Sequence, residues 1–123
     1  MAAGPTRKGR ISRSGDFQRA YRAGRSRASR FLVVYAFVRP EASDASEARL
    51  GVSVGRKVGG AVERNRVKRV LREAFSSLAP ELPASHDFVV VARPEIVERL
   101  EREGSGWVAA ELSELSGAAA KVG

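Results

Sequence analysis

The fold of this 123-residue chain is decided by one stretch near its middle, Arg49-Leu-Gly-Val-Ser-Val-Gly-Arg-Lys-Val-Gly-Gly-Ala-Val-Glu-Arg-Asn-Arg-Val-Lys-Arg-Val-Leu-Arg-Glu-Ala-Phe75. Its first residues alternate between aliphatic and small or polar side chains, which predicts a half-buried β-strand. The core side of that strand would hold Leu50, Val52 and Val54, and the other side Arg49, Gly51 and Ser53. Two glycines, 59 and 60, then interrupt the pattern, and a helical period follows over 61–78. The stretch therefore predicts a strand, a glycine turn and a long amphipathic helix.

The predicted helix has two different faces when its residues are projected at 3.6 per turn. The apolar face, expected to be buried, comprises Val67, Val70, Leu71, Ala74, Phe75 and Leu78. The opposite face comprises Asn65, Lys68, Arg69, Arg72 and Ser76, with Arg64 and Arg66 beside it. Like charges at i and i+4 cost roughly a few tenths of a kcal/mol per pair, and a phosphate backbone along this face would offset that cost. Arginine predominates, and its planar fork binds phosphate bidentately. The pattern predicts a nucleic-acid-binding helix.

The charge of the chain is unevenly distributed around its net value of +8. Residues 1–72 hold 18 Lys and Arg against 5 Asp and Glu, whereas residues 73–123 hold 4 against 9. Such a polarised surface favours a polyanionic partner. The absence of cysteine excludes a disulfide scaffold and thiolate metal sites. The longest apolar run, 31–38, is too short to span a bilayer, and the N-terminus lacks a signal-peptide centre, so a cytoplasmic protein is expected.

The remaining segments predict an α/β (α+β) sandwich in the order α-β-β-β-α-β-α, with about four strands in a mixed sheet and three helices. Residues 1–13 would form a basic flexible arm and residues 14–123 a single domain. We expect a short helix over 14–24, and a basic connector or short edge strand over 25–30. A strand over 31–38 would place Phe31, Val33, Tyr35 and Phe37 on one side. A polar loop over 40–47 and a strand over 87–93 complete the predicted sheet region.

The C-terminal part is less strongly patterned. Residues 94–103 predict at most a short turn of helix. A last amphipathic helix is expected from Trp107 to about Ala119, with Leu112 and Leu115 also packing against the core.

Aromatic residues suggest a second binding element beside the basic helix. Phe17 and Tyr21 share a face of the predicted first helix, and Tyr35 lies on the aromatic side of the first long strand. Packed across the sheet beside Ser53 and Lys57, they would form a groove that suits single-stranded nucleic acid. Aromatic residues at helical spacing also serve as core residues, and the pattern leaves both interpretations open.

Residues 51–75 closely resemble the signature of the bacterial ribonuclease P protein subunit. The specific part is Arg64-Asn65-Arg66, followed by Lys68-Arg69, Arg72 and Phe75. Asp16-Phe17-Gln18 with Tyr21 is similar to the first helix of that family, and residues 87–93 are similar to its last strand. The resemblance covers roughly residues 10–94.

The resemblance implies an α/β sandwich whose basic helix lies in a left-handed βαβ crossover. It implies an accessory subunit of a tRNA 5′-maturation endoribonuclease, in which a catalytic RNA removes the 5′ leader from precursor tRNA. Arg64, Asn65, Arg66, Lys68, Arg69 and Arg72 would bind the RNA subunit. Phe17, Tyr21, Tyr35, Ser53 and Lys57 would line the leader cleft. Mg²⁺ would be bound mainly by RNA, with Arg64 and Asn65 helping to position it.

No catalytic residue is expected in the protein itself, since its acidic residues in the basic half are scattered and form no metal-ligand set. No organic cofactor, membrane or protein partner is implied. One alternative is a general or ribosomal RNA-binding module without an enzymatic role. A nucleotide-binding enzyme is disfavoured, because the glycines at 55–60 lack the Gly-Lys-Ser/Thr of a phosphate loop.

Overall fold

The computed structural model describes residues 25–38, 48–83 and 85–121. In chain order the elements are β1 (Arg25–Ala28), β2 (Leu32–Val38), β3 (Arg49–Val54), α2 (Ala61–Leu78), the 3-10 helix η2 (Ala79–Glu81), β4 (His86–Ala92), α3 (Glu95–Glu103) and α4 (Val108–Lys121). The expected arm at 1–13 and the first helix, with Phe17 and Tyr21, lie outside the described residues and stay predictions.

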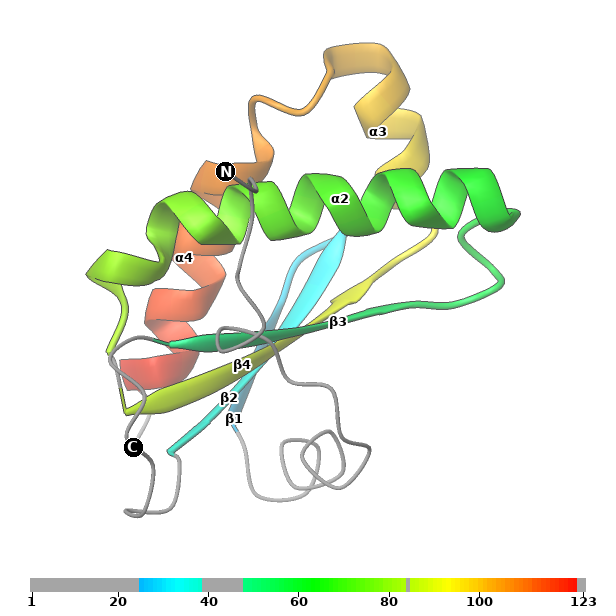
Figure 1. The fold of residues 1–123 in the computed structure, drawn as a ribbon. Coiled ribbons are helices and arrows are strands. Elements are labelled where there is room, and N and C mark those ends of the chain that lie inside the picture. Colours follow the sequence, from blue (N-terminus) through cyan, green and yellow to red (C-terminus); the bar gives the residue numbers. More distant parts are fainter. Residues whose placement is uncertain (1–24, 39–47, 84, 122–123) are drawn as a thin grey trace.

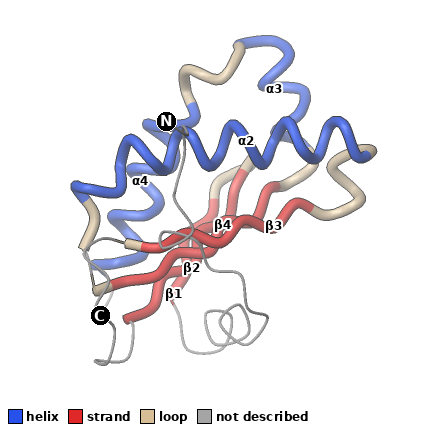
Figure 2. Tube along the Cα trace, in the orientation of Figure 1, coloured by secondary structure: helices blue, strands red, loops and turns tan. Residues whose placement is uncertain are grey.

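The four strands form one mixed sheet in the order β1-β2-β4-β3. β2 pairs antiparallel with β1 and β4, whereas β3 pairs parallel with β4. The predicted mixed sheet of about four strands is confirmed. For residues 25–30, the structure selects the edge strand of the two alternatives. Figures 1 and 2 show α2 running above this sheet, with α3 and α4 on the same side of it.

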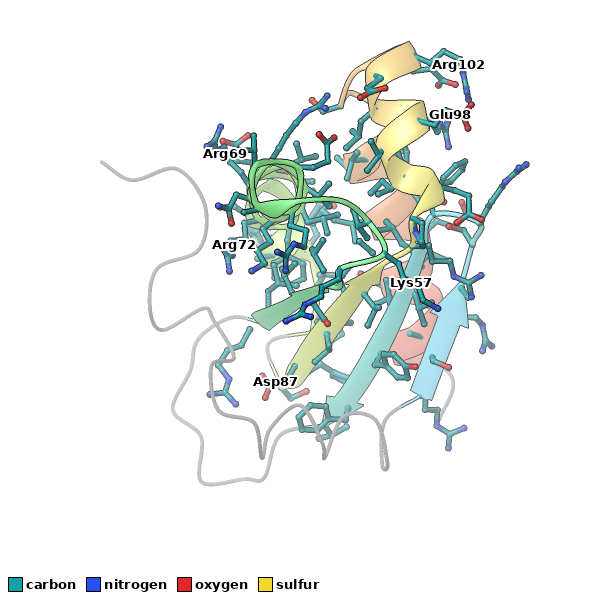
Figure 3. The ribbon with its side chains drawn as sticks, turned by 90° about the vertical axis from the view of Figure 1, so that its right-hand side faces the viewer. Lys57, Arg69, Arg72, Asp87, Glu98 and Arg102 are labelled. Carbon is teal, nitrogen blue, oxygen red and sulfur yellow. The ribbon has the colours of Figure 1, made fainter. Side chains whose placement is uncertain are left out.

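The connection from β3 through α2 to β4 is left-handed. In Figure 1 both strands run from left to right, α2 returns above them, and β4 lies behind β3. Figure 3, viewed from the right, places β3 at the left edge of the sheet beside β4. Right-handed crossovers are the strong default for parallel strands. The unusual handedness therefore agrees with what the family resemblance implied.

The hydrophobic core lies between the sheet and the helices. Strand alternation sends Leu32, Val34 and Ala36 of β2 into it. The predicted apolar face of α2 is confirmed, since Val67 and Leu71 are fully buried. The other members of this face, Val70, Ala74, Phe75 and Leu78, are buried or pack against the same core. The predicted packing role of Trp107, Leu112 and Leu115 in the C-terminal region is also confirmed.

The segment after β4 differs from the sequence-based expectation. A nine-residue helix, α3, occupies residues where only a short turn was expected. Pro94 is its N-cap residue, and proline is tolerated at a helix start because the first N–H groups have no intrahelical acceptor. Ile96 and Leu100, four positions apart, are buried on its inner side.

Phe31 was assigned to the wrong side of the sheet. It precedes the first residue of β2 and packs against the helix-side core rather than beside Tyr35. A turn at Ser29 causes this, because the Ser29 hydroxyl accepts hydrogen bonds from the backbone N–H groups of Phe31 and Leu32 at 3.2 and 3.3 Å. The strict alternation of an extended strand therefore begins only at Leu32.

Candidate nucleic-acid interface

The outer face of α2 carries Arg64, Asn65, Arg66, Lys68, Arg69 and Arg72, which we call the basic stripe. The helix begins after Gly60, which provides no side-chain cap. Gly59 is required by close packing, because a Cβ there would lie 2.9 Å from the Cβ of Glu63. The glycine pair thus lets the chain turn tightly from β3 into α2. This turn places the stripe at the edge of the sheet formed by β3.

The stripe presents its polar groups on the side of α2 away from the core. Asn65 and Arg69 are exposed, whereas the other four members are half-buried. Figure 3 shows Arg69 and Arg72 projecting from the side of α2 that faces away from α3. Arg66 pairs with Glu63 at 3.2 Å, one helical turn earlier. The face is therefore a row of cationic donors on a rigid support.

Arg64 has a feature that the sequence did not reveal. Its side chain is half-buried, and its Nε is fully buried without a hydrogen-bond partner. A buried donor without an acceptor costs free energy, since it has lost its hydration. An anion reaching this guanidinium could supply an acceptor to its outer N–H groups. Arg64 is thus a half-buried member of the stripe whose Nε carries an unsatisfied donor.

The sheet face opposite the helices brings together two of the five residues expected in the leader cleft. The register aligns Tyr35 with Val89 and Gly51, and it aligns Val91 with Ser53 in the neighbouring row. Tyr35 and Ser53 therefore lie on one face, as the alternation predicted. Both are half-buried. Gly51 contributes no side chain beside Tyr35 and is itself buried.

Lys57 is placed beyond the end of β3 rather than on the sheet face itself. It is exposed in a turn closed by a 3.1 Å hydrogen bond from Val58 N–H to the Gly55 carbonyl. The same end of the sheet carries further exposed cations at Arg30, Arg56 and Arg93. Sequence reasoning gave no role to Arg30 or Arg93. Strand register places Arg30 and Arg93 at the same end of the sheet as Lys57, because Ala92 pairs with both Leu32 and Val54.

A buried ion pair lies on the same sheet face and was also missed. Arg49 donates from Nε and Nη2 to the two carboxylate oxygens of Asp87 at 2.8 and 2.5 Å. The sequence signal was present, because an arginine and an aspartate stand at corresponding positions of two strands. Their pairing could not be inferred without the register of β3 against β4.

Two kinds of feature are absent from the described residues. Within residues 25–38, 48–83 and 85–121, no group of three or more His, Asp or Glu side chains is arranged to hold a metal ion. None of the helices in this part of the chain has the length and apolar character needed to cross a membrane.

Known proteins share both the sequence and the fold. The family model described as Ribonuclease P matches residues 6–113. The chain is 41% identical over 87 residues to the ribonuclease P protein component of Ligilactobacillus salivarius, which covers 71% of this chain and 74% of that protein. It is 38% identical over 98 residues to the component from Bacillus cereus ATCC 14579, covering 80% of each.

Solved structures give the same result. The RNase P protein from Thermotoga maritima superposes with a TM-score of 0.75 at 31% identity, covering 87% of this chain and 94% of that chain. A Staphylococcus aureus RNase P protein mutant with defective mRNA degradation activity gives 0.74 at 34% identity, covering 86% of both chains. With the family model matched over most of the sequence and the fold shared, the chain belongs to the ribonuclease P protein family.

Proposed function

We propose that this chain assists a catalytic RNA in removing the 5′ leader from precursor tRNA, with the RNA subunit bound by α2 and the leader bound on the sheet. Family membership supports the coarser role of a ribonuclease P protein component in tRNA processing. The division of labour between α2 and the sheet follows what the family resemblance implied and is supported by the chemistry of the residues.

The observation that carries the proposal is the separation of the two faces of α2. Val67 and Leu71 are fully buried on one side, while Asn65 and Arg69 are exposed on the other. Folding therefore uses the apolar side, and the basic stripe is left to bind a polyanion. Arginine can bind phosphate bidentately and can stack on bases, and the Asn65 amide can donate to or accept from a base edge or ribose hydroxyl. Folded RNA offers all of these groups.

The leader would lie across the sheet face that bears Tyr35 and Ser53, with Lys57 at its end. A single strand needs rings on which bases stack and cations that follow its phosphates. Tyr35 offers the ring, and the cluster of exposed Lys57, Arg56 and Arg93 offers the charge. Phe17 and Tyr21 would complete the stacking surface. Product tRNA lacks the leader, so such binding favours precursor over product.

Magnesium ions would be held mainly by the RNA. The protein near the stripe supplies guanidinium groups, which cannot ligate a cation, and one neutral amide oxygen, on Asn65. Glu63, the nearest carboxylate in sequence, is already paired with Arg66. These groups suit hydrogen bonding to the phosphates that bind Mg²⁺. They do not suit direct coordination of the ion. When bound, Mg²⁺ would supply the activated water for phosphodiester hydrolysis. The protein's part is to screen charge and position the substrate.

The test is multiple-turnover cleavage of a precursor tRNA at low millimolar Mg²⁺ by a bacterial ribonuclease P RNA, with and without the protein. We expect stimulation by the protein and no cleavage by the protein alone. The matched variants are Tyr35→Ala, for the leader face, and Arg69→Ala, for the stripe. Tyr35→Ala should reduce the preference for precursor over leaderless tRNA, whereas Arg69→Ala should weaken binding of the RNA subunit.

Two results would reject the proposal. Cleavage by the protein alone would assign the chemistry to the polypeptide. Tight, salt-sensitive RNA binding without any stimulation would instead indicate a general RNA-binding module.

A further inference from the structure

A second group of exposed cations lies at the sheet edge farthest from the basic stripe. β1 is the outer strand on that side, and Figure 3 shows it at the edge opposite β3, over which α2 lies. Arg25 and Arg27 of β1, which we call the β1 arginines, are exposed, as is Arg30 in the turn that follows. Within residues 25–38, 48–83 and 85–121, no carboxylate forms an ion pair with any of them. The edge is thus cationic without compensation.

The strand register shows which side of the sheet these cations occupy. Arg25 lies opposite Ala36, and Arg27 lies opposite Val34. Directly opposed residues in an antiparallel pair share a face, and Val34 and Ala36 point into the helix-side core. Arg25 and Arg27 therefore lie on the helix-bearing side of the sheet edge. They are not part of the face that carries Tyr35.

Local hydrogen bonds order β1 and the turn after it, and the side chain of Arg27 makes one of them. Arg27 donates from Nη1 to the Ser26 carbonyl at 2.9 Å, which holds its guanidinium along the strand. A guanidinium has five N–H donors, so most remain available. The Ser29 turn that positions Arg30 is closed by a 2.8 Å hydrogen bond from Ser29 N–H to the Leu32 carbonyl. Cationic groups on ordered backbone lose less freedom on binding a ligand.

We propose that the β1 arginines bind the phosphate backbone of a second RNA segment, distinct from the one bound by the basic stripe. This inference rests on the proposed function. Arg25 and Arg27 are two residues apart along a strand, which separates them by about 6.8 Å. That spacing is comparable with the distance between neighbouring phosphates in an RNA strand. β1 carries no aromatic residue on which a base could stack. The contact would therefore be to the phosphate charges and would not depend on the base sequence.

The two cationic surfaces are far enough apart to act independently. Three strand intervals of about 4.8 Å separate β1 from β3, or roughly 14 Å across the sheet. Screening at physiological ionic strength acts over about 8 Å, so exposed charges on the two edges interact weakly. One RNA segment would contact α2 and another would contact β1. The protein would then be held between two parts of the assembled RNA.

A different explanation for the same arginines is protection of a sheet edge. Charged residues on edge strands discourage pairing with the edge strand of another molecule. This explanation predicts no contribution to RNA affinity, and it predicts self-association when the charges are removed. The two explanations therefore make opposite predictions for one variant.

The decisive variant is Arg25→Gln with Arg27→Gln in the full chain, measured by equilibrium binding to a bacterial ribonuclease P RNA over a range of salt concentrations. We expect binding roughly tenfold weaker, with a salt slope shallower by about 1–2. Arg102→Gln is the control, because Arg102 is exposed on α3 and paired with Glu98 and Glu103. It should leave both affinity and slope unchanged. Combined with Arg69→Gln, the fold-changes should multiply, since the sites are distant.

Thermal unfolding and sedimentation of each variant separate binding from folding and self-association. Unchanged affinity and slope in the double variant, with weaker binding by Arg69→Gln, would overturn this inference and leave the proposed function standing. Self-association of the double variant with unchanged RNA binding would also overturn it, in favour of edge protection. Unchanged binding in both the double variant and Arg69→Gln would instead count against the proposed function.

Discussion

Asp87 holds the guanidinium of Arg49 through two hydrogen bonds, from Nε at 2.8 Å and from Nη2 at 2.5 Å. The two residues are register partners in the parallel pairing of β3 with β4. The side chain of Asp87 is fully buried, whereas that of Arg49 is 26% exposed. On this face β3 otherwise offers only Gly51 and Ser53. The ion pair therefore links the side chains of β3 and β4 on this face.

Replacing Arg49 by Gln should destabilise the fold strongly. The carboxylate of Asp87 would stay buried and lose its hydrogen bonds from the Arg49 guanidinium, and breaking such a pair costs about 3–5 kcal/mol. Partial exposure of Arg49 puts the expected loss at the lower end. Urea unfolding measures it, and adding Asp87→Asn should recover part of the loss because a buried charge is removed. Equal stability of Arg49→Gln and the parent chain would show that the pair is dispensable.

Substitutions on the two faces of α2 should have opposite effects. Arg69→Ala removes an exposed cation and should weaken RNA binding about tenfold and reduce the salt slope by about 1, with little change in folding. Leu71→Asp places a carboxylate at a fully buried position and should unfold the domain. Circular dichroism and RNA titration on the same samples check both. Unfolding by Arg69→Ala would mean that the faces are wrongly assigned.

The guanidinium of Arg99 lies over two neighbouring rings, 4.8 Å from the centroid of Phe31 and 4.0 Å from that of Trp107. Arg99→Met should retain much of the packing but lose both the cation–π attraction, worth about 1 kcal/mol, and the 3.2 Å hydrogen bond to Glu103. Trp107 is the only tryptophan, so its fluorescence reports this site directly. We expect a changed emission maximum in the variant. An unaltered spectrum and unaltered stability would contradict a stabilising role for the stack.

Glu103 gives the C-terminal half a pH dependence. Its hydrogen bond from Arg99 is the main cause that lowers the pKa of the carboxyl below its ordinary value of 4.5. Because the pKa of Glu103 is lower in the folded state than its ordinary value, the ionised carboxylate stabilises the fold at pH values above that ordinary value. This stabilisation is lost as the pH falls through the folded-state pKa. Glu103→Gln should therefore be less stable than the parent at neutral pH and equal to it in strong acid. Thermal melts over pH 2–7 check this, and a constant difference across the range would be inconsistent with it.

The central elements could be predicted because local pattern and tertiary packing agree there. The helix expected over 61–78 has those bounds in the structure, since a glycine pair precedes it and prolines follow. The apolar face of this helix was also predicted correctly. Val67 and Ala74 are seven residues apart, and with the apolar residues around them they decide which side of the helix meets the sheet. The basic stripe follows as the remaining side. The assignment of its members to RNA contacts stays a prediction.

Other features depend on relationships between distant segments. The left-handed crossover was available only through resemblance, because local sequence does not specify handedness and the general rule predicts the opposite. The side occupied by Phe31 depends on where β2 begins, which the Ser29 turn decides. The shared end of Arg30, Lys57 and Arg93 depends on strand register. None of these can be read from spacing along the chain.

The crossover has a consequence for assembly. α2 is the only covalent path from β3 to β4, and it also carries the basic stripe. The cations of the basic stripe repel one another, which opposes formation of α2. Pairing of β3 with β4 depends on this helix, because it connects the two strands. A ligand that binds only the folded state raises its apparent stability by mass action. RNA is therefore a thermodynamic partner in folding as well as a binding partner, and the melting temperature of the protein should rise with RNA concentration.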